Sequence, residues 1–315
     1  MANNPTVSVV IPCFNHGIYL GDALQSIHQQ SFQDFEIIVV DDGSTDAGSL
    51  AALARLESQV SSLIRTSNQG VIHARNTGIA AARGRYILAL DADDKIGPGY
   101  LEQAVALLDA KPALGIVYCK AEYFGDKSGP WELPPYRFPE ILIGNVIFNA
   151  GVFRRADWES VGGYNPNMHQ GWEDFDFWLA LIGLGREVQQ LPDTLFYYRI
   201  RHNSRNAAMA DDHARFVQAH VQIYHNHQGL YEQHMDVVFS EIVRLWGVVA
   251  HHQGEAQRLH SALQLLASQH AQLQHEQQTL LATHAAVQQQ LAALPTQTPN
   301  HDDNRLPRWL RRLLS

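Results

Sequence analysis

YILALDADD, residues Tyr86–Asp94, decides the fold of this 315-residue chain. The run YILAL predicts a short strand that is buried on both faces. Three aspartates follow it within four residues. Carboxylates this close repel one another, so they need a partner that offsets their charge. The stretch therefore predicts a buried strand that ends in a ligand site.

Short apolar runs of the same kind recur along the first third of the chain, and segments of helical length separate them. The other runs are Val7–Ile11, Phe35–Val40, Val60–Ile64 and Leu114–Tyr118. The helical segments are about 18–30, 46–58, 71–83 and 99–110. This alternation predicts an α/β fold with a mostly parallel sheet and helices on both faces.

In such sheets, ligands bind beyond the carboxyl ends of the strands. Pro12, Phe14 and Asn15 follow the first predicted strand, DDGSTD (Asp41–Asp46) follows the second, and DADD (Asp91–Asp94) follows the fourth. Polar side chains thus gather at the one edge where a site is expected.

The aspartates after the fourth strand suit a divalent cation, Mn²⁺ or Mg²⁺. Mg²⁺ takes one or two carboxylates and fills its shell with substrate phosphates. Asp91 and Asp93, two residues apart on a strand end, are expected to face one cation with a bound diphosphate. The alternative is a solvated acidic turn, with Asp94 capping the helix that starts near Pro98. The apolar strand that delivers these acids to the ligand edge favours the metal site, and Asp94 remains open between ligand and cap.

Composition excludes several classes of protein. The net charge of −9 speaks against nucleic acid as a partner. Two cysteines, Cys13 and Cys119, are too few for a disulfide framework or a thiolate zinc site, and a reducing cytoplasm is expected. No G-x-G-x-x-G, G-x-x-x-x-G-K-[ST] or G-x-S-x-G motif occurs. The first residues do not predict a signal peptide, and no apolar stretch of the sequence predicts a membrane-spanning helix.

The sequence changes character after about residue 209. Residues 209–294 are predicted to be helical, and apolar residues recur every seven positions at Leu259, Leu266, Leu273, Leu280, Val287 and Leu294. This spacing predicts self-association through a coiled coil over 255–294, or a helix packed on another surface. Residues 295–304 are expected to be a linker. RLPRWLRRLLS (305–315) is a cationic amphipathic segment that predicts peripheral contact with an anionic membrane or docking on the protein itself.

Three ordered blocks carry a resemblance to a known family. They are residues 7–46, NQGVIHARNTGIAAARGRYILALDADD (68–94) and GWEDFDFWLAL (171–181). Together they resemble family 2 glycosyltransferases over about residues 5–205. The resemblance implies the GT-A fold of nucleotide-diphospho-sugar transferases, a Rossmann-like three-layer sandwich, over 1–208. Its nucleotide-binding half would be 1–119 and its acceptor and catalytic half 120–208, and the reaction would be inverting.

The resemblance also assigns roles on the donor side. It implies that Asp41 reads the nucleotide base and that the loop after the first strand lines the base and ribose. The family's nucleotide-side positions correspond to Arg75 and Asn76, and its D-x-D motif to Asp91, Ala92 and Asp93. Asp91 would lie near ribose and metal, and Asp93 would bind the metal.

On the acceptor side, Asp174 matches the family's general base. Glu173 is the second choice as the base and otherwise orients the acceptor, whereas Asp176 is expected to be structural. Aromatic neighbours are expected to raise the pKa of Asp174. Trp172 is a candidate for stacking on an acceptor sugar, and Trp178 is expected in the core.

One block departs from the family pattern. Where members often carry Y-R-x-H-x-x-S, this chain has YYRIRHNS, so Arg201 takes the histidine's place and His202 follows. A histidine ligand to the metal is therefore doubtful, and Arg201 is expected to hold the diphosphate directly.

These residues predict a cytoplasmic, metal-dependent inverting glycosyltransferase, with a place at the inner face of the cell membrane. It would move a sugar from a nucleotide diphosphate donor, UDP-linked, to a hydroxyl of a glycan or lipid-linked acceptor in bacterial polysaccharide synthesis. The alternatives are a metal-dependent nucleotidyltransferase, for which PCFNHG lacks a triphosphate loop, and a non-catalytic scaffold that presents the tail.

Overall fold

The computed structural model describes residues 4–201 and 212–293. The chain divides into two compact units, Met1–Val243 and Arg244–Ser315, which are treated separately. The predicted linker 295–304 and cationic segment 305–315 lie outside the described residues, as do His202 and Leu294.

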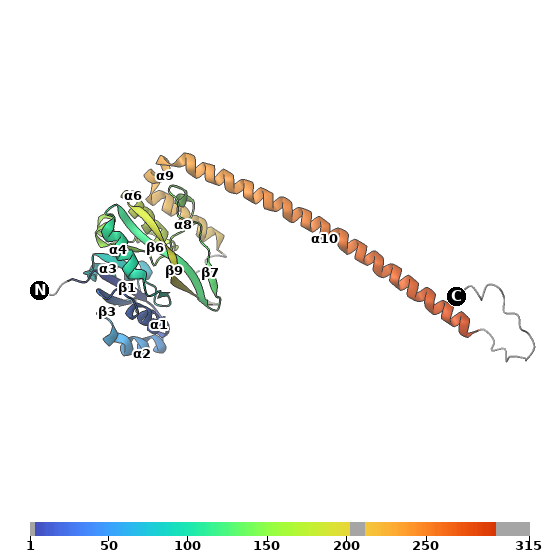
Figure 1. Cartoon of the computed structure of the whole chain (residues 1–315), viewed down its shortest axis with the longest axis horizontal. Helices are drawn as coiled ribbons and strands as arrows, with labels where there is room; N and C mark the ends of the chain where they lie inside the picture. The colour runs from blue at the N-terminus through green and yellow to red at the C-terminus, as the bar shows by residue number, and fades with distance from the viewer. Residues whose placement is uncertain (1–3, 202–211, 294–315) are drawn as a thin grey trace, which may run out of the picture. The chain divides into compact units, whose positions relative to one another are not determined.

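The first half of the sheet is parallel. Strands pair in the order β3-β2-β1-β4, formed by Ser62–Arg65, Phe35–Asp41, Val7–Cys13 and Tyr86–Ala89. All four residues of β4 are buried, so the prediction of a buried strand before the aspartates is confirmed. Helices α1 (Gly17–His28), α2 (Ala47–Leu56) and α3 (Val71–Ala81) lie between these strands in the sequence, as Figure 1 shows.

Local signals explain where two of these helices sit. Asp46 caps α2, because its Oδ1 accepts the backbone N–H of Ser49 at 2.7 Å. Gly78 lets α3 lie close against β1, since a Cβ there would come within 2.4 Å of Cγ1 of Val10. The α/β prediction is confirmed over this region.

The second half of the sheet is mixed. β8 (Val152–Arg154) runs antiparallel between β4 and β6 (Leu114–Gly125), whereas β9 (Glu187–Ile200) runs parallel to β6. The short strands β5 (Lys95–Ile96) and β7 (Gly129–Trp131) pair antiparallel with β9 and β6. β9 is one strand of 14 residues, and register shifts interrupt its pairing with β6 between Leu114 and Ala121.

The helices of this half carry or support the site. They are α4 (Tyr100–Ala110), α5 (Arg155–Val161) and α6 (Glu173–Gly183), with the 3₁₀ turn η2 (Glu140–Ile143); a second 3₁₀ turn, η1 (Glu57–Gln59), follows α2 in the first half.

Residues 212–293 hold the helices α8 (His213–Asn226), α9 (Gln228–Gln233) and α10 (Met235–Ala292). The first two belong to the first unit, where Asn226 donates to Asp176 at 2.7 Å and Tyr231 donates to the Leu142 carbonyl at 2.7 Å. α10 is one helix of 58 residues. Over residues 4–201 and 212–293, no helix is both long and apolar enough to cross a membrane.

Candidate active site

Residues 91–94 form a tight turn after β4, in which the Asp94 N–H donates to the Asp91 carbonyl at 3.1 Å. Asp91 and Asp93 have side chains that are 33% and 13% exposed, whereas Ala92 and Asp94 are 1% and 0% exposed. That Asp91 and Asp93 face one cation stays a prediction. Ala92, predicted as part of the binding motif, contributes core packing at this point.

Asp94 has a role that neither of the open alternatives gave it. Its Oδ1 accepts the backbone N–H of Arg199 at 2.9 Å, and its carboxyl group is fully buried. Burial raises its pKa well above the ordinary value, and the nearby charges of Asp93 and Asp91 add to this. The helix that follows has Gly99 at its N-cap and no side-chain cap. Asp94 therefore anchors β9 to the end of β4.

Arg75 joins the aspartate motif (Asp91–Asp94) to the E-D motif, which we define as Glu173 and Asp174. Its Nη2 lies 2.9 Å from Oδ1 of Asp91, and its Nη1 lies 2.9 Å from Oε1 of Glu173. The side chain is 3% exposed. Burial lowers the pKa of Arg75, but the two carboxylates raise it further, so the net shift is upward and the guanidinium stays charged. Two motifs far apart in the sequence thus share one buried cation.

Arg201 and His16 meet at Asp93. Nη2 of Arg201 lies 2.8 Å from Oδ2 of Asp93, and Nδ1 of His16 lies 4.0 Å from the same oxygen. Burial, followed by the charge of Asp91, raises the pKa of Asp93. The sequence analysis did not predict His16 as a site residue. Its position directly after Asn15, in the loop that follows the first strand, could have indicated it.

The predicted base-binding residues lie on two loops that are tied together. Asp41 is buried and its Oδ1 accepts the N–H of Ser44 at 2.9 Å. Asn15 has a positive φ of 55° and accepts the N–H of Thr45 at 2.8 Å. Phe14 is 40% exposed beside them. These contacts hold the two strand-end loops against each other at the predicted edge.

A second acid, Asp42, fixes a third loop. It accepts the N–H groups of Gln69 at 3.0 Å and Gly70 at 2.7 Å, directly before α3. The sequence reasoning did not single out Asp42, although DDGSTD contains it. Pro12 lies half-buried within β1.

Asn76 makes structural contacts in this structure. Its Oδ1 accepts from Nε1 of Trp158 at 3.1 Å and from the Tyr164 N–H at 2.9 Å, and its Nδ2 donates to the Tyr164 carbonyl at 2.8 Å. These bonds fasten α3 to the loop that follows α5. The nucleotide-side role predicted for Asn76 has no support among these contacts and stays a prediction.

The E-D motif opens α6 in a strained turn. Trp172 is the N-cap residue, with a φ of 64° in the left-handed region that bulky residues avoid. Its ring packs edge-on against Phe216 at 5.3 Å and His220 at 5.1 Å, both from α8. The acceptor-stacking role predicted for Trp172 therefore competes with packing between helices.

Among the residues that the structure describes, Glu173 pairs with Arg75 and no arginine lies within ion-pair distance of Asp174. Oδ2 of Asp174 lies 3.3 Å from Nδ2 of Asn145, which was not predicted. Burial and then the charge of Glu173 raise the pKa of Asp174 to about 7, while Arg75 lowers it in part. A carboxylate with a pKa near neutrality is suited to accept a proton. Glu173 is held in the ion pair with Arg75, which makes it the weaker candidate base.

The remaining predictions on α6 concern its structure. Asp176 is 3% exposed and accepts from Asn226 at 2.7 Å, with Nε2 of His227 at 2.9 Å, as a structural residue would. Trp178 is fully buried, and its Nε1 donates to the Ile147 carbonyl at 3.1 Å.

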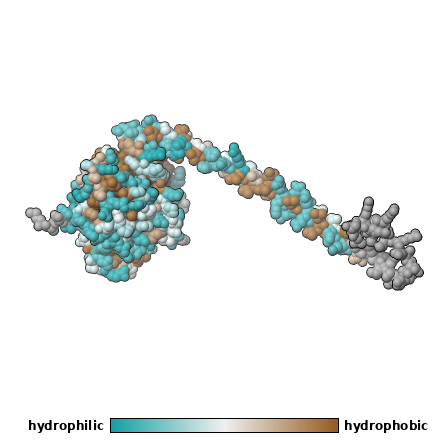
Figure 2. All heavy atoms as spheres, in the orientation of Figure 1, coloured by the Kyte–Doolittle hydropathy of each residue, from teal (hydrophilic) through white to brown (hydrophobic). Residues whose placement is uncertain are grey.

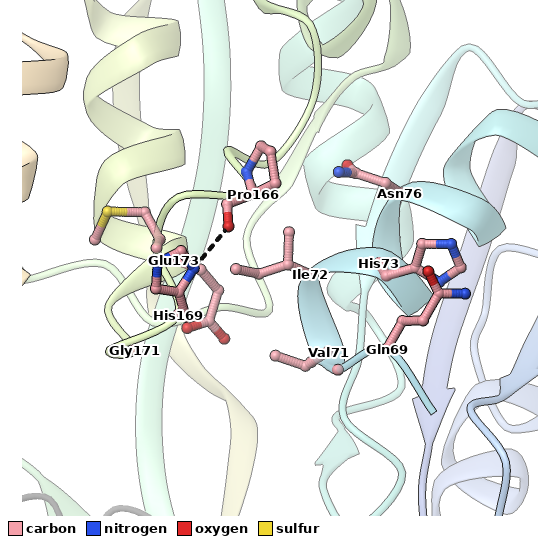
Figure 3. A pocket seen from close by; sticks show the side chains of 11 residues that line it. Gln69, Val71, Ile72, His73, Asn76, Pro166, His169, Gly171 and Glu173 are labelled. Atoms are coloured by element: carbon pink, nitrogen blue, oxygen red, sulfur yellow. Dashed lines mark hydrogen bonds between the residues drawn. The ribbon is translucent and has the colours of Figure 1, made fainter. Parts of the chain in front are cut away.

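A cavity of about 410 Å³ lies beside this charged network (Figure 3). One wall is the start of α3, from Gln69 to His73, and the other is the loop that includes Pro166 and His169. Glu173 contributes to the cavity wall, so the cavity reaches the E-D motif.

Asp91 and Asp93 provide a donor set that fits a divalent cation. Each is bonded to an arginine through one carboxylate oxygen, at 2.9 and 2.8 Å. Burial and mutual repulsion raise the pKa of Asp93, and a cation would relieve that repulsion. Within the described ranges there is no cluster of three His, Cys, Asp or Glu ligands. Two carboxylates that leave the rest of the shell to phosphates match the preference of Mg²⁺.

Comparison with known proteins gives a consistent family. Residues 8–161 match the family described as Glycosyl transferase family 2. A curated uncharacterized glycosyltransferase of Haemophilus influenzae is 26% identical over 224 residues, which cover 66% of this chain and 69% of that protein.

Two solved structures share the fold. TarS residues 1–349 of S. aureus, solved in complex with UDP-GlcNAc, is 19% identical with a TM-score of 0.53, and the match covers 73% of each chain. The mannosyltransferase PcManGT of Pyrobaculum calidifontis, solved with GDP-Man and Mn²⁺, is 22% identical with a TM-score of 0.54 over 73% of this chain and 71% of that one. At these identities the likeness establishes the fold.

Proposed function

This chain belongs to glycosyltransferase family 2 and has the GT-A fold, and from that premise we propose that it is a metal-dependent, inverting transferase that uses a nucleotide diphosphate sugar. The observation that carries the proposal is the double ion pair of Arg75. It brings Asp91 of the predicted donor and metal site and Glu173 of the predicted base motif onto one guanidinium, at 2.9 Å each. The predicted donor half and acceptor half thus converge on one site.

Asp174 is the proposed general base. Its carboxylate takes the proton of the acceptor hydroxyl as that oxygen bonds to the anomeric carbon. The bond between the anomeric carbon and the diphosphate breaks on the opposite face, so the configuration inverts. Asn145, at 3.3 Å, orients the carboxylate.

The donor side is proposed to hold the diphosphate by charge. Asp91 and Asp93 would hold the divalent cation, which supplies neutralisation of the leaving diphosphate. Arg201, whose Nη2 lies 2.8 Å from Asp93, would contact the same phosphates. The base and ribose would be lined by residues at the ends of β1 and β2 and in the loop after β1: Asp41, Pro12, Phe14 and Asn15.

A UDP-linked sugar is the proposed donor, supported by the UDP-GlcNAc bound to TarS. The GDP-Man of PcManGT marks the guanine donors as the competitor to test. A glycan or lipid-linked hydroxyl, in bacterial polysaccharide synthesis, is the proposed acceptor. The family match favours this enzyme over the nucleotidyltransferase and scaffold alternatives.

The pH dependence of transfer follows from Asp174. A base must be unprotonated to act, and the pKa of this carboxyl is raised to about 7. The rate is therefore expected to rise with pH, to reach half its maximum near pH 7, and to level off above about pH 8. Measuring kcat/KM from pH 5.5 to 9 at saturating metal tests this, and a flat profile down to pH 5.5 would contradict it.

Removing the metal ligand is expected to remove the metal response. The change Asp93→Asn should lower transfer in Mn²⁺ or Mg²⁺ by about 10²-fold, because cation stabilisation of the leaving diphosphate contributes several kcal/mol. Chelation of the wild type should produce a similar loss. The exposed acid Asp109, which pairs with Arg85 on the surface, provides the control Asp109→Asn. Equal metal activation in Asp93→Asn and wild type would overturn the assignment.

A further inference from the structure

The helix α10 exposes an apolar stripe along its length. Leu259, Leu266, Leu273 and Leu280 have exposed fractions of 67%, 60%, 62% and 71%. Figure 2 shows hydrophobic residues recurring along this helix among hydrophilic ones. Helices in proteins gain most of their stability by burying such a face. We therefore expect another surface to pack against the apolar stripe of this 58-residue helix.

The spacing of the stripe identifies the kind of surface. From Leu245 to Val287, apolar side chains recur every seven residues, at Leu245, Leu259, Leu266, Leu273, Leu280 and Val287, with His252 as the one exception. A strict seven-residue period keeps a seam straight only against another helix in a left-handed supercoil. The covering surface is therefore a helix that runs alongside α10.

Charge points to a second copy of the same chain. Between Leu259 and Ala292 the only Asp, Glu, Lys or Arg is Glu276. Selective pairing with a different helix normally depends on complementary charges flanking the seam. The near absence of charge here offers no such selection, and it also leaves two identical helices free of repulsion.

The other seam positions set the direction and register. Taking the leucine stripe as position d places Val249, Ala256, Leu263, His270, Gln277, His284 and Leu291 at position a. In a parallel, in-register pair, each polar residue meets its own copy. In an antiparallel pair, or one shifted by a heptad, some of them face leucine instead and lose partners for their polar atoms. Val249, a β-branched residue at a that follows Leu245 at d, favours two strands.

We propose that α10 joins two copies of this chain in a parallel, in-register coiled-coil dimer. The polar a positions His270, Gln277 and His284 fix the register of the dimer. They also lower the stability of the dimer relative to apolar residues at the same positions. Because both chains enter α10 from its N-terminus, this pairing gives one particle two transferase units that start from the same end of the coil.

Light scattering during gel filtration of the full chain at about 20 µM tests the pairing. The wild type is expected at about twice 35.3 kDa. The pair Leu266→Asp with Leu273→Asp is expected to give monomer. The matched pair Leu265→Asp with Gln272→Asp adds the same charge one residue earlier, off the seam, and should stay dimeric; Leu265 is 60% exposed, as Leu266 is. A monomeric wild type, a trimeric mass, or equal dissociation of both pairs would overturn the proposal.

Two further measurements test the polar layer and the direction. Gln277→Leu should lower the dissociation constant by about tenfold or more, whereas Gln278→Leu, outside the seam, should leave it unchanged. Leu259→Cys and Val287→Cys should each form a disulfide with its own copy on oxidation; Cys13 and Cys119 are buried and do not interfere. If the two variants cross-linked only when mixed, the pair would be antiparallel and the proposal would fail.

Discussion

Replacing Asp174 by asparagine is expected to lower kcat for sugar transfer by about 10²–10⁴-fold, the usual contribution of a general base. Asparagine has the same shape but cannot take the acceptor's proton. The donor contacts lie on other elements, so the dissociation constant for the nucleotide sugar should change by less than about threefold. Single-turnover kinetics with a saturating acceptor, together with donor-induced thermal stabilisation, measures the two quantities separately.

The control for this change lies two residues further along the same helix. Asp176→Asn alters the acid that binds Asn226 and His227 and does not line the site. It is expected to lower the melting temperature while keeping kcat within about fivefold. Glu173→Gln separates the two neighbouring candidates for the base. If Asp174→Asn kept the wild-type rate and Glu173→Gln lost it, the roles would have to be exchanged.

The buried strand before the aspartates could be predicted from sequence because its signal is local. The burial of Tyr86–Ala89 follows from a short run of apolar residues. The place of Asp94 could not be predicted in this way, because residues 91–94 form a turn in which the Asp94 N–H donates to the Asp91 carbonyl at 3.1 Å. The carboxylate of Asp94 accepts the N–H of Arg199, which is 105 positions away in the sequence.

Contacts between distant segments could not be predicted in the same way. Arg75 and Glu173 are 98 positions apart, and Asn76 and Tyr164 are 88 apart. The resemblance assigned Arg75 and Asn76 to the nucleotide, whereas their bonds here go to acids and to backbone. Trp172 likewise meets Phe216 of α8, which lies beyond the region that resembles the family. Such contacts depend on how helices and strands pack against one another. The spacing of apolar residues along the sequence does not predict that packing.

Charge compensation is a property that emerges only from the assembled site. Asp91 and Glu173 share Arg75, and Asp93 meets Arg201. Asp174 has no arginine within ion-pair distance among the described residues, and its pKa is the one raised to about 7. The arrangement pairs the neighbouring carboxylates with arginines and leaves Asp174 with a pKa near neutrality, which suits the role of a general base.

The change Arg75→Met tests this arrangement. It leaves Asp91 and Glu173 without their buried cation, so the free energy of unfolding is expected to fall by about 3–5 kcal/mol. Arg75 also lowers the pKa of Asp174, so its loss should raise that pKa above about 7. Below its pKa the base is protonated and inactive, so the acid limb of the pH profile should move to higher pH. Thermal unfolding and kcat/KM between pH 6 and 9.5 measure the two effects.

An exposed ion pair provides the matched comparison. Arg85 lies 2.9 Å from Asp109 with side chains that are 58% and 41% exposed, so Arg85→Met should cost at most about 1 kcal/mol and leave the pH profile in place. Adding Glu173→Gln to Arg75→Met removes one of the uncompensated carboxylates and should restore part of the lost stability. It should also return the acid limb towards its wild-type position, because Glu173 raises the pKa of Asp174. Equal small losses for Arg75→Met and Arg85→Met, with an unmoved acid limb, would show that the site does not depend on a shared buried cation.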